Sequence, residues 1–241
     1  MSAARTGRAG AGATAKATQL ARQERPQVLL MAAAGALPGT LIGVLTSSVL
    51  IGAVLALAGA VASGMWQRGR GTAARWRMGA EGERRTGRHL NLLRLRPGWT
   101  VLHDRAMPGT RANVDHLIIS PDGTVFNVDA KVRRGRVKYN PRRNYLQVGR
   151  TSGYQLVSST VFESERIAAV LQAHMGRPVP VRSALAVHRA AIPTWHDITL
   201  KGVRVLPARA TRRWLLAQAG PRTEAGREVA AACQHLFPPY T

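Results

Sequence analysis

Residues 113–132 read NVDHLIISPDGTVFNVDAKV, and this stretch decides the fold of the chain. It consists of two apolar-rich segments, 113–119 and 124–132, separated by Ser-Pro-Asp-Gly. Proline presets φ for a turn and glycine accepts a positive φ, so the four residues suit a tight connection. Two such segments around turn residues predict a β-hairpin.

Helical and extended patterns surround this hairpin. Before it, 79–95 is predicted as a helix that Pro97-Gly98 ends, and 99–103 as a short strand. After it, the sequence predicts strands at 145–148, 179–187 and 203–206 and helices at 156–175, 211–219 and 224–236. The order α-β-β-β-α-β, followed by a βα tail, predicts an α/β fold around a mixed sheet.

The rare acidic residues of the predicted hairpin are the first candidates for a functional site. Only 12 Asp and Glu oppose 35 Lys and Arg in the whole chain. Asp115 lies in the first strand and Asp129 in the second. A four-residue turn places position 115 opposite 128, whereas a five-residue loop places it opposite Asp129; either register brings the carboxylates to about 5 Å. Two carboxylates at this distance repel each other, and a divalent cation relieves the repulsion.

Lys131 is the second candidate. It lies two residues after Asp129, so both side chains share one face of the strand. The chain has 31 Arg but Lys only at positions 16, 131, 138 and 201, so a lysine is unexpected here. An ammonium beside a metal-bound carboxylate orients or activates a water and holds a phosphate as a compact charge. The alternatives are a solvated edge-strand lysine and two ordinary ion-paired aspartates. His116 points to the opposite face, which favours a packing or surface role.

A run of basic residues follows Lys131 directly and suits a nucleic-acid backbone. Tyr139 and Tyr145 are interspersed and could stack on exposed bases. The alternative is a solvated basic loop. The run comprises Arg133, Arg134, Arg136, Lys138, Arg142 and Arg143.

The net charge of +23 and the apolar residues are unevenly distributed. Residues 1–27 form a basic arm that we expect to be disordered, 28–67 contain no charged residue, 68–78 form a basic linker, and 79–241 form the main domain. The uncharged block is long enough for a transmembrane hairpin, roughly 28–45 and 48–66, or for one span over 41–63. Basic residues flank it on both sides, so either topology places the C-terminal domain in the cytoplasm.

Two further readings concern the ends of this block. Ala60-Val61-Ala62 is similar to a signal-peptidase site, but the long leader and the long apolar run argue against cleavage. The basic stretch Arg68–Arg85 is suited to contact with anionic lipid.

Four motifs in order resemble the nuclease-related domain (NERD) of the PD-(D/E)xK nuclease-like superfamily. They are Gly79-Ala80-Glu81-Gly82-Glu83, Asn113-Val114-Asp115-His116, Asp122-Gly123 and Asp129-Ala130-Lys131. The resemblance covers about residues 76–190. It implies a restriction-endonuclease-like core, a helix acid at Glu83, metal-binding carboxylates at Asp115 and Asp129, and a catalytic lysine at Lys131. Outside the resemblance, Glu83 reads as a first-turn acid favoured by the helix dipole.

The resemblance predicts a membrane-anchored, Mg²⁺- or Mn²⁺-dependent nuclease that hydrolyses phosphodiester bonds, in DNA rather than RNA. One departure concerns the glutamine that many superfamily nucleases carry on the helix after the third strand. Gln155 and Gln172 are the nearest residues, and neither matches well. The alternatives are an inactive nuclease-like module that binds nucleic acid or a partner, and a membrane protein whose basic domain holds anionic lipid.

Overall fold

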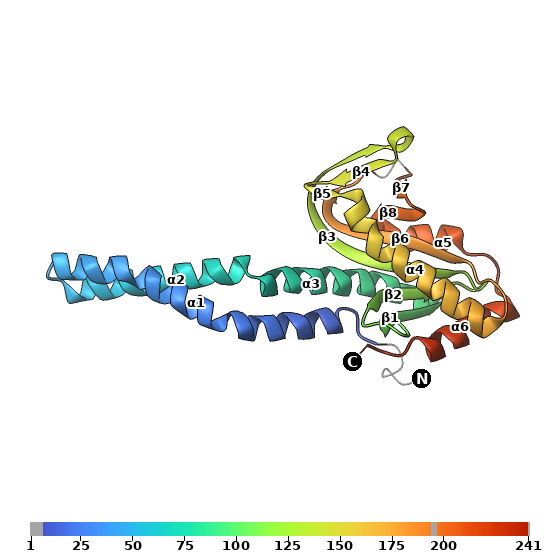
Figure 1. Cartoon of the computed structure of the whole chain (residues 1–241), viewed down its shortest axis with the longest axis horizontal. Helices are drawn as coiled ribbons and strands as arrows, with labels where there is room; N and C mark the ends of the chain where they lie inside the picture. The colour runs from blue at the N-terminus through green and yellow to red at the C-terminus, as the bar shows by residue number, and fades with distance from the viewer. Residues whose placement is uncertain (1–6, 194–196, 241) are drawn as a thin grey trace. The chain divides into compact units, whose positions relative to one another are not determined.

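The structure, a computed structural model, describes residues 7–193 and 197–240 (Figure 1). The chain divides into two compact units. One contains Ala13–Met78, and the other combines the N-terminal residues up to Gly12 with Gly79–Thr241.

The smaller unit is built on two apolar helices, α1 (Ala11–Leu45) and α2 (Val49–Arg70). Both are long and apolar enough to cross a membrane by length and composition. The chain turns between them at residues 46–48, where the two-helix prediction places the turn. The helices are longer than predicted and extend beyond the uncharged block at both ends.

Small residues line the contact between α1 and α2. A Cβ on Gly39 would lie 2.1 Å from the backbone nitrogen of Ala56, and one on Gly43 would lie 2.6 Å from the Cα of Gly52. Only glycine permits so close an approach of two backbones, and membrane helices pack in this way. Large apolar side chains such as Leu37 and Leu50 are meanwhile exposed.

The two ends of this unit differ from the prediction. Residues 11–27, expected to be a disordered arm, belong to α1. The expected linker is also helical, because α3 (Thr72–Asn91) begins one residue after α2 ends. The Glu24 side chain explains part of this order, since its Oε1 accepts a hydrogen bond from Ala73 N–H at 3.1 Å in the first turn of α3.

The larger unit is built on a mixed sheet, which confirms the predicted α/β class. Its strands lie in the order β1-β2-β3-β6-β8-β7. The first three are antiparallel, β3, β6 and β8 are parallel, and β7 is antiparallel to β8. The bounds are β1 Thr100–Ala106, β2 Asn113–Ile119, β3 Val125–Asn140, β6 Val181–Ala191, β7 Thr199–Leu200 and β8 Val203–Pro207.

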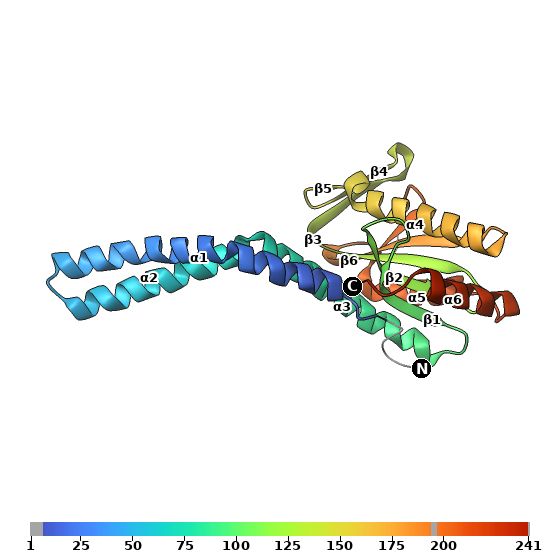
Figure 2. The same ribbon diagram turned by 60° about the horizontal axis from the view of Figure 1, so that its bottom comes forward.

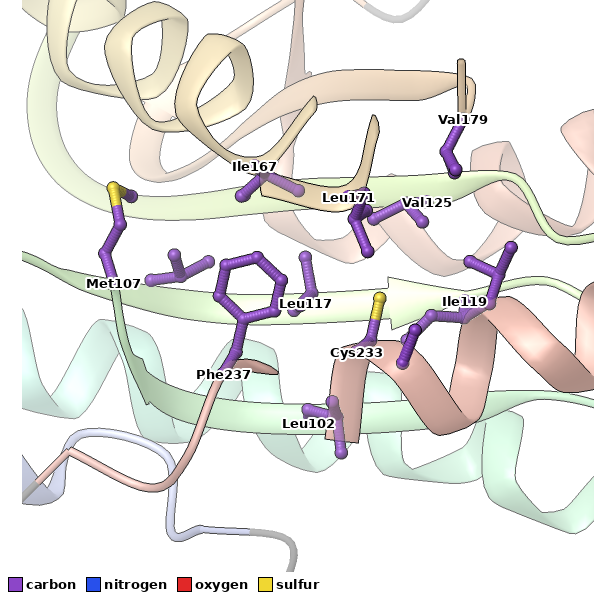
Figure 3. Close-up of a cluster of buried hydrophobic side chains, with 13 residues drawn as sticks. Leu102, Met107, Leu117, Ile119, Val125, Ile167, Leu171, Val179, Cys233 and Phe237 are labelled. Carbon is purple, nitrogen blue, oxygen red and sulfur yellow. The ribbon is translucent and has the colours of Figure 1, made fainter. Parts of the chain in front are cut away.

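Helices cover both faces of this sheet (Figure 2). On one face, α4 (Gly153–Met175) and α6 (Glu224–Leu236) bury a cluster that includes Ile167, Leu171 and Phe237 against β1, β2 and β3 (Figure 3). On the other face, the end of α3, the short turn η2 (Leu92–Leu95) and α5 (Thr211–Gln218) bury a second cluster around Phe126. The result is a three-layer α/β/α arrangement.

β3 is longer than predicted. The sequence places its end at 132, but the strand continues to Asn140, then turns through η3 (Pro141–Arg143) and pairs with β4 (Tyr145–Val148), which in turn pairs with the short β5 (Thr151–Ser152). Its pairing with β6 shifts between Val132 and Gly135, where the backbone φ of Gly135 is +108°. The basic run therefore lies on a strand and a turn instead of a loop.

Candidate active site on β2, β3 and α4

Asp115 and Asp129 occupy neighbouring positions on β2 and β3. β2 pairs with β3 from Ile119 with Val125 to His116 with Val128. The next pair in this register is Asp115 with Asp129. This is the five-residue-loop register, closed by hydrogen bonds between Ser120 and Thr124. The carboxylate of Asp115 reaches across, since its Oδ2 accepts a hydrogen bond from the Ala130 N–H at 3.0 Å.

Asp129 is held from two elements. Its Oδ2 accepts hydrogen bonds from the hydroxyls of Thr160, at 2.9 Å, and Ser159, at 3.2 Å, both on α4. Its Oδ1 lies 2.8 Å from Nζ of Lys131. The Lys131 ammonium is therefore the charged partner of this buried oxygen, whereas both hydroxyls contact Oδ2. The Asp129 side chain is 3% exposed and that of Lys131 29%, so the pair opens to solvent on the lysine side.

Burial, with a further contribution from mutual repulsion, raises the pKa values of the carboxylates in this site. Burial raises the pKa of Glu83, on α3, to about 7, with further contributions from Asp104 and Asp129. Burial and the charges of Glu83 and Asp129 raise the pKa of Asp115 well above its usual value. The opposite holds for Lys131. Burial alone would lower the pKa of its ammonium, but the charges of Asp129 and Asp115 outweigh that and raise it. The site is therefore a group of acids around one protonated lysine.

Glu163, on α4, is a site residue that the sequence reasoning missed. Its Oε2 accepts a hydrogen bond at 3.2 Å from Nδ2 of Asn127, which shares a strand face with Asp129 and Lys131. Burial and the charge of Asp129 raise the pKa of Glu163 to about 8. Its position four residues after Ser159, and so on the same side of α4, is the signal in the sequence that could have revealed it.

The donor set fits a hard divalent cation. Oxygen ligands from carboxylates are those that Mg²⁺ and Mn²⁺ prefer. Asp115, Asp129 and Glu83 offer such oxygens, and a cation would lower the repulsion that adds to burial in raising the pKa values of Asp115 and Glu83. Within the described ranges, no three His, Cys, Asp or Glu side chains are already gathered around one point. A metal at this carboxylate would require side-chain rearrangement, beginning with Lys131, whose ammonium contacts Oδ1 of Asp129.

The basic residues predicted to bind nucleic acid continue along the strand that carries Asp129. Arg133, Arg134, Arg136 and Lys138 lie on β3, and Arg142 and Arg143 on η3. All but Arg133 are exposed, and Nη1 of Arg133 donates to the carbonyl oxygen of Val132 at 2.8 Å. None of the six forms an ion pair with a carboxylate of a described residue.

The remaining predicted residues divide into two kinds. Gln155 and Gln172 are exposed on α4, so the structure adds no support for either as a fifth site residue. His116 is fully buried on the face away from Asp129, where its Nδ1 lies 2.9 Å from Nδ1 of His103. This agrees with the packing role that strand alternation predicts.

The family comparison agrees with the geometry. The model of the nuclease-related domain (NERD) matches residues 78–188, so this part of the chain is a nuclease-related domain. The matched region contains all four predicted site residues and Glu163. No curated protein and no solved structure matches the chain significantly.

Proposed function

We propose that the protein is a divalent-metal-dependent nuclease, anchored in a membrane by α1 and α2, that hydrolyses phosphodiester bonds in DNA at the cytoplasmic face. The observation that carries the proposal is the pairing of Asp115 with Asp129 across two strands, with Lys131 on the same strand face. A NERD domain over this region makes nuclease-like chemistry the expectation.

Each residue has a distinct role in this proposal. Asp115 and Asp129 would hold Mg²⁺ or Mn²⁺, and Glu83 would complete or orient the site. When bound, the metal supplies Lewis-acid polarisation of the phosphate and an acidified water. Because its pKa is raised, Lys131 acts as a fixed positive charge that stabilises charge developing on the phosphate. Ser159 and Thr160 keep the Asp129 carboxylate in place through their hydroxyls.

The DNA backbone would follow β3 away from the site. Six basic side chains that have no carboxylate partner in the described part of the chain continue from Lys131 along the strand and the η3 turn, and arginines of this kind bind phosphates without reading sequence. Tyr145, exposed at the start of β4, is placed where it can stack on a base.

Membrane anchoring rests on α1 and α2. They are apolar and long, they pack through small residues, and they expose large apolar side chains. The positive-inside rule would put the basic ends of the pair in the cytoplasm, where Arg68–Arg85 would contact anionic lipid.

The test is cleavage of plasmid and single-stranded DNA by the full chain, purified in detergent, with Mg²⁺, with Mn²⁺ or with a chelator. The proposal predicts cleavage that requires the metal and falls by about 10²–10³-fold in Asp129→Ala and Lys131→Ala. Exposed Lys201 provides the matched control, because Lys201→Ala removes one ammonium outside the site. Cleavage by Asp129→Ala equal to that of the wild type would refute the assignment.

The second candidate function is a nuclease-like module that binds DNA without cutting it. The Lys131 ammonium occupies Oδ1 of Asp129, the oxygen that neither hydroxyl contacts, and this favours a module without a metal. It predicts salt-sensitive DNA binding that needs no metal and survives Asp129→Ala. Loss of DNA binding on neutralising Arg133, Arg134 and Arg136, without any cleavage by the wild type, would favour this reading. Binding to anionic vesicles but not to DNA would favour a lipid-holding domain.

A further inference from the structure

A polar cavity of the larger unit lies beside α3. Its volume is about 490 Å³, within the range of small-molecule sites. Its walls come from three parts of the larger unit: the segment 7–9, the helix α3 with the following turn η2, and β1. None of the four residues assigned to the nuclease site lines it.

The N-terminal segment is packed against this cavity. A Cβ on Gly7 would lie 2.0 Å from the carbonyl oxygen of His103, and one on Gly87 would lie 2.5 Å from the Cβ of Ala9. The φ of Gly7 is +65°, a conformation that glycine adopts without strain. Two glycines thus allow the segment to lie directly on β1 and on α3, which closes one side of the cavity.

Arginines from separate elements converge on the cavity. Arg8 comes from the N-terminal segment, Arg84 and Arg88 from successive turns of α3, and Arg94 from η2. Across the described ranges, no carboxylate forms an ion pair with any of the four. Glu81 is the only acid in the wall, and it already pairs with Arg85 and Arg189. The cavity therefore carries a strong, uncompensated positive charge.

A chain of hydrogen bonds makes Asn91, an uncharged residue of the wall, a donor as well. His103 is buried, and its Nε2 lies 3.0 Å from Oδ1 of Asn91, so Nε2 carries the proton and donates it. A neutral His103 then accepts at Nδ1 from Nδ1–H of His116, 2.9 Å away, and Nε2 of His116 is left as a buried acceptor without a partner. The Asn91 oxygen is thereby occupied, and its NH₂ group is what remains for a ligand.

From these contacts we infer that the cavity is a binding site for a small molecule with two or more phosphate groups, such as a pyrophosphate or a nucleoside polyphosphate. Four guanidinium groups and one amide offer donors only, which suits phosphate oxygens. The charge of four arginines matches a diphosphate or triphosphate better than the single charge of a phosphodiester. The volume of about 490 Å³ suits a small molecule.

The test is titration calorimetry of the full chain in detergent with inorganic pyrophosphate, without divalent metal. We expect one site per chain. The double variant Arg84→Ala/Arg88→Ala should lower the affinity about 30-fold, from roughly 1 kcal/mol for each lost charge-assisted contact. The matched control, Arg142→Ala/Arg143→Ala, removes the same charge from the β3–β4 turn and should leave pyrophosphate binding unchanged.

A more conservative variant tests whether a loss of pyrophosphate binding comes from a folding defect. Asn91→Asp keeps the shape of the side chain but replaces donor by acceptor and adds a negative charge, so it should abolish pyrophosphate binding while the thermal midpoint stays close to that of the wild type. Absence of binding by the wild type would overturn the inference. So would equal losses in the two double variants, because that result indicates unspecific charge.

Two further titrations separate the possible sources of phosphate. A 20-nucleotide single-stranded DNA should respond to Arg142→Ala/Arg143→Ala and not to Arg84→Ala/Arg88→Ala, and phosphatidylglycerol vesicles should respond equally to both. A larger loss of DNA or vesicle binding than of pyrophosphate binding in Arg84→Ala/Arg88→Ala would overturn the inference. The site is independent of metal-dependent cleavage, so it stands or falls separately from the proposed function.

Discussion

The two halves of β3 have opposite chemistry on one continuous strand. From Val125 to Ala130 every residue is buried, and Asp129 is bound by two hydroxyls and an ammonium. From Arg134 to Asn140 most side chains are exposed and the charged ones have no carboxylate partner among the described residues. The shift in pairing between Val132 and Gly135 separates the two halves.

This difference indicates which half of β3 can carry specific chemistry. In the buried half a charge requires defined partners, because an uncompensated charge costs several kcal/mol there. Asp129, the acid of that half, therefore has defined partners and neighbours with perturbed pKa values. In the exposed half water solvates each arginine, so charge can accumulate without defined geometry and suits a polymer backbone. The predictions below test this contrast.

We expect the largest difference in stability between variants of the two lysines of β3. Lys131→Met leaves Asp129 without its counter-charge beside Asp115 and Glu163, and we expect a loss of about 2 kcal/mol of stability, less than for a fully buried pair because Lys131 is partly exposed. Lys138→Met in the exposed half should change stability by less than about 0.5 kcal/mol. Thermal denaturation in metal-free buffer measures both. Equal effects would remove the contrast between the halves.

The exposed half is tested by DNA affinity. We expect Arg134→Ala/Arg136→Ala to weaken binding of a short DNA duplex about 10-fold and to lower the salt dependence by about two counter-ions, with no change in the thermal midpoint. Fluorescence anisotropy at several salt concentrations measures this. DNA binding that is unaffected by the double variant would exclude the exposed half of β3 as the DNA interface.

We expect a smaller effect on stability from removing one of the two hydroxyls that hold Asp129. Thr160→Val keeps the side-chain shape but removes the hydrogen bond to Oδ2 of Asp129, and should cost about 1 kcal/mol of stability. Ser158→Val on the same helix is the control, because Ser158 is exposed. A destabilisation by Ser158→Val as large as that by Thr160→Val would contradict the role of this hydrogen bond.

The pH dependence of stability should follow the raised acids. Glu83 and Glu163 bind protons up to pH about 7 and 8 in the folded chain but lose them near 4.5 when unfolded. The folded state therefore binds more protons between these values, and metal-free stability should fall as pH rises from about 5 to 8. Glu163→Gln should reduce this fall in the thermal midpoint, and added Mg²⁺ should reverse it. Stability that rises over this range would contradict the assigned cluster.

The sequence predicted the elements whose ends carry turn residues or a clear apolar period. The bounds of β2, β4 and α6 agree with the prediction, as do Asp115, Asp129 and Lys131 on two paired strands. Alternation and turn chemistry are local, so they are visible in one sequence.

What failed depends on tertiary contacts. The outer half of β3 reads as a basic loop until its pairing with β4 and the packing of Val137 and Tyr139 are known. Glu163 reads as one polar position on a helix until Asn127 is found opposite it. The helix over 11–27 has no apolar periodicity that predicts it, and contacts such as that of Glu24 with the start of α3 are not visible in the sequence.

The most direct test of the central claim, that the carboxylates of β2 and β3 hold one metal, is the anomalous diffraction of crystals of the full chain grown with Mn²⁺. The account predicts one strong peak per chain within coordination distance of carboxylate oxygens of Asp115 and Asp129, with Lys131 moved off Oδ1 of Asp129, and no peak in Asp129→Asn. A peak elsewhere, or an unchanged ion pair between Lys131 and Asp129 without a peak in saturating Mn²⁺, would contradict it.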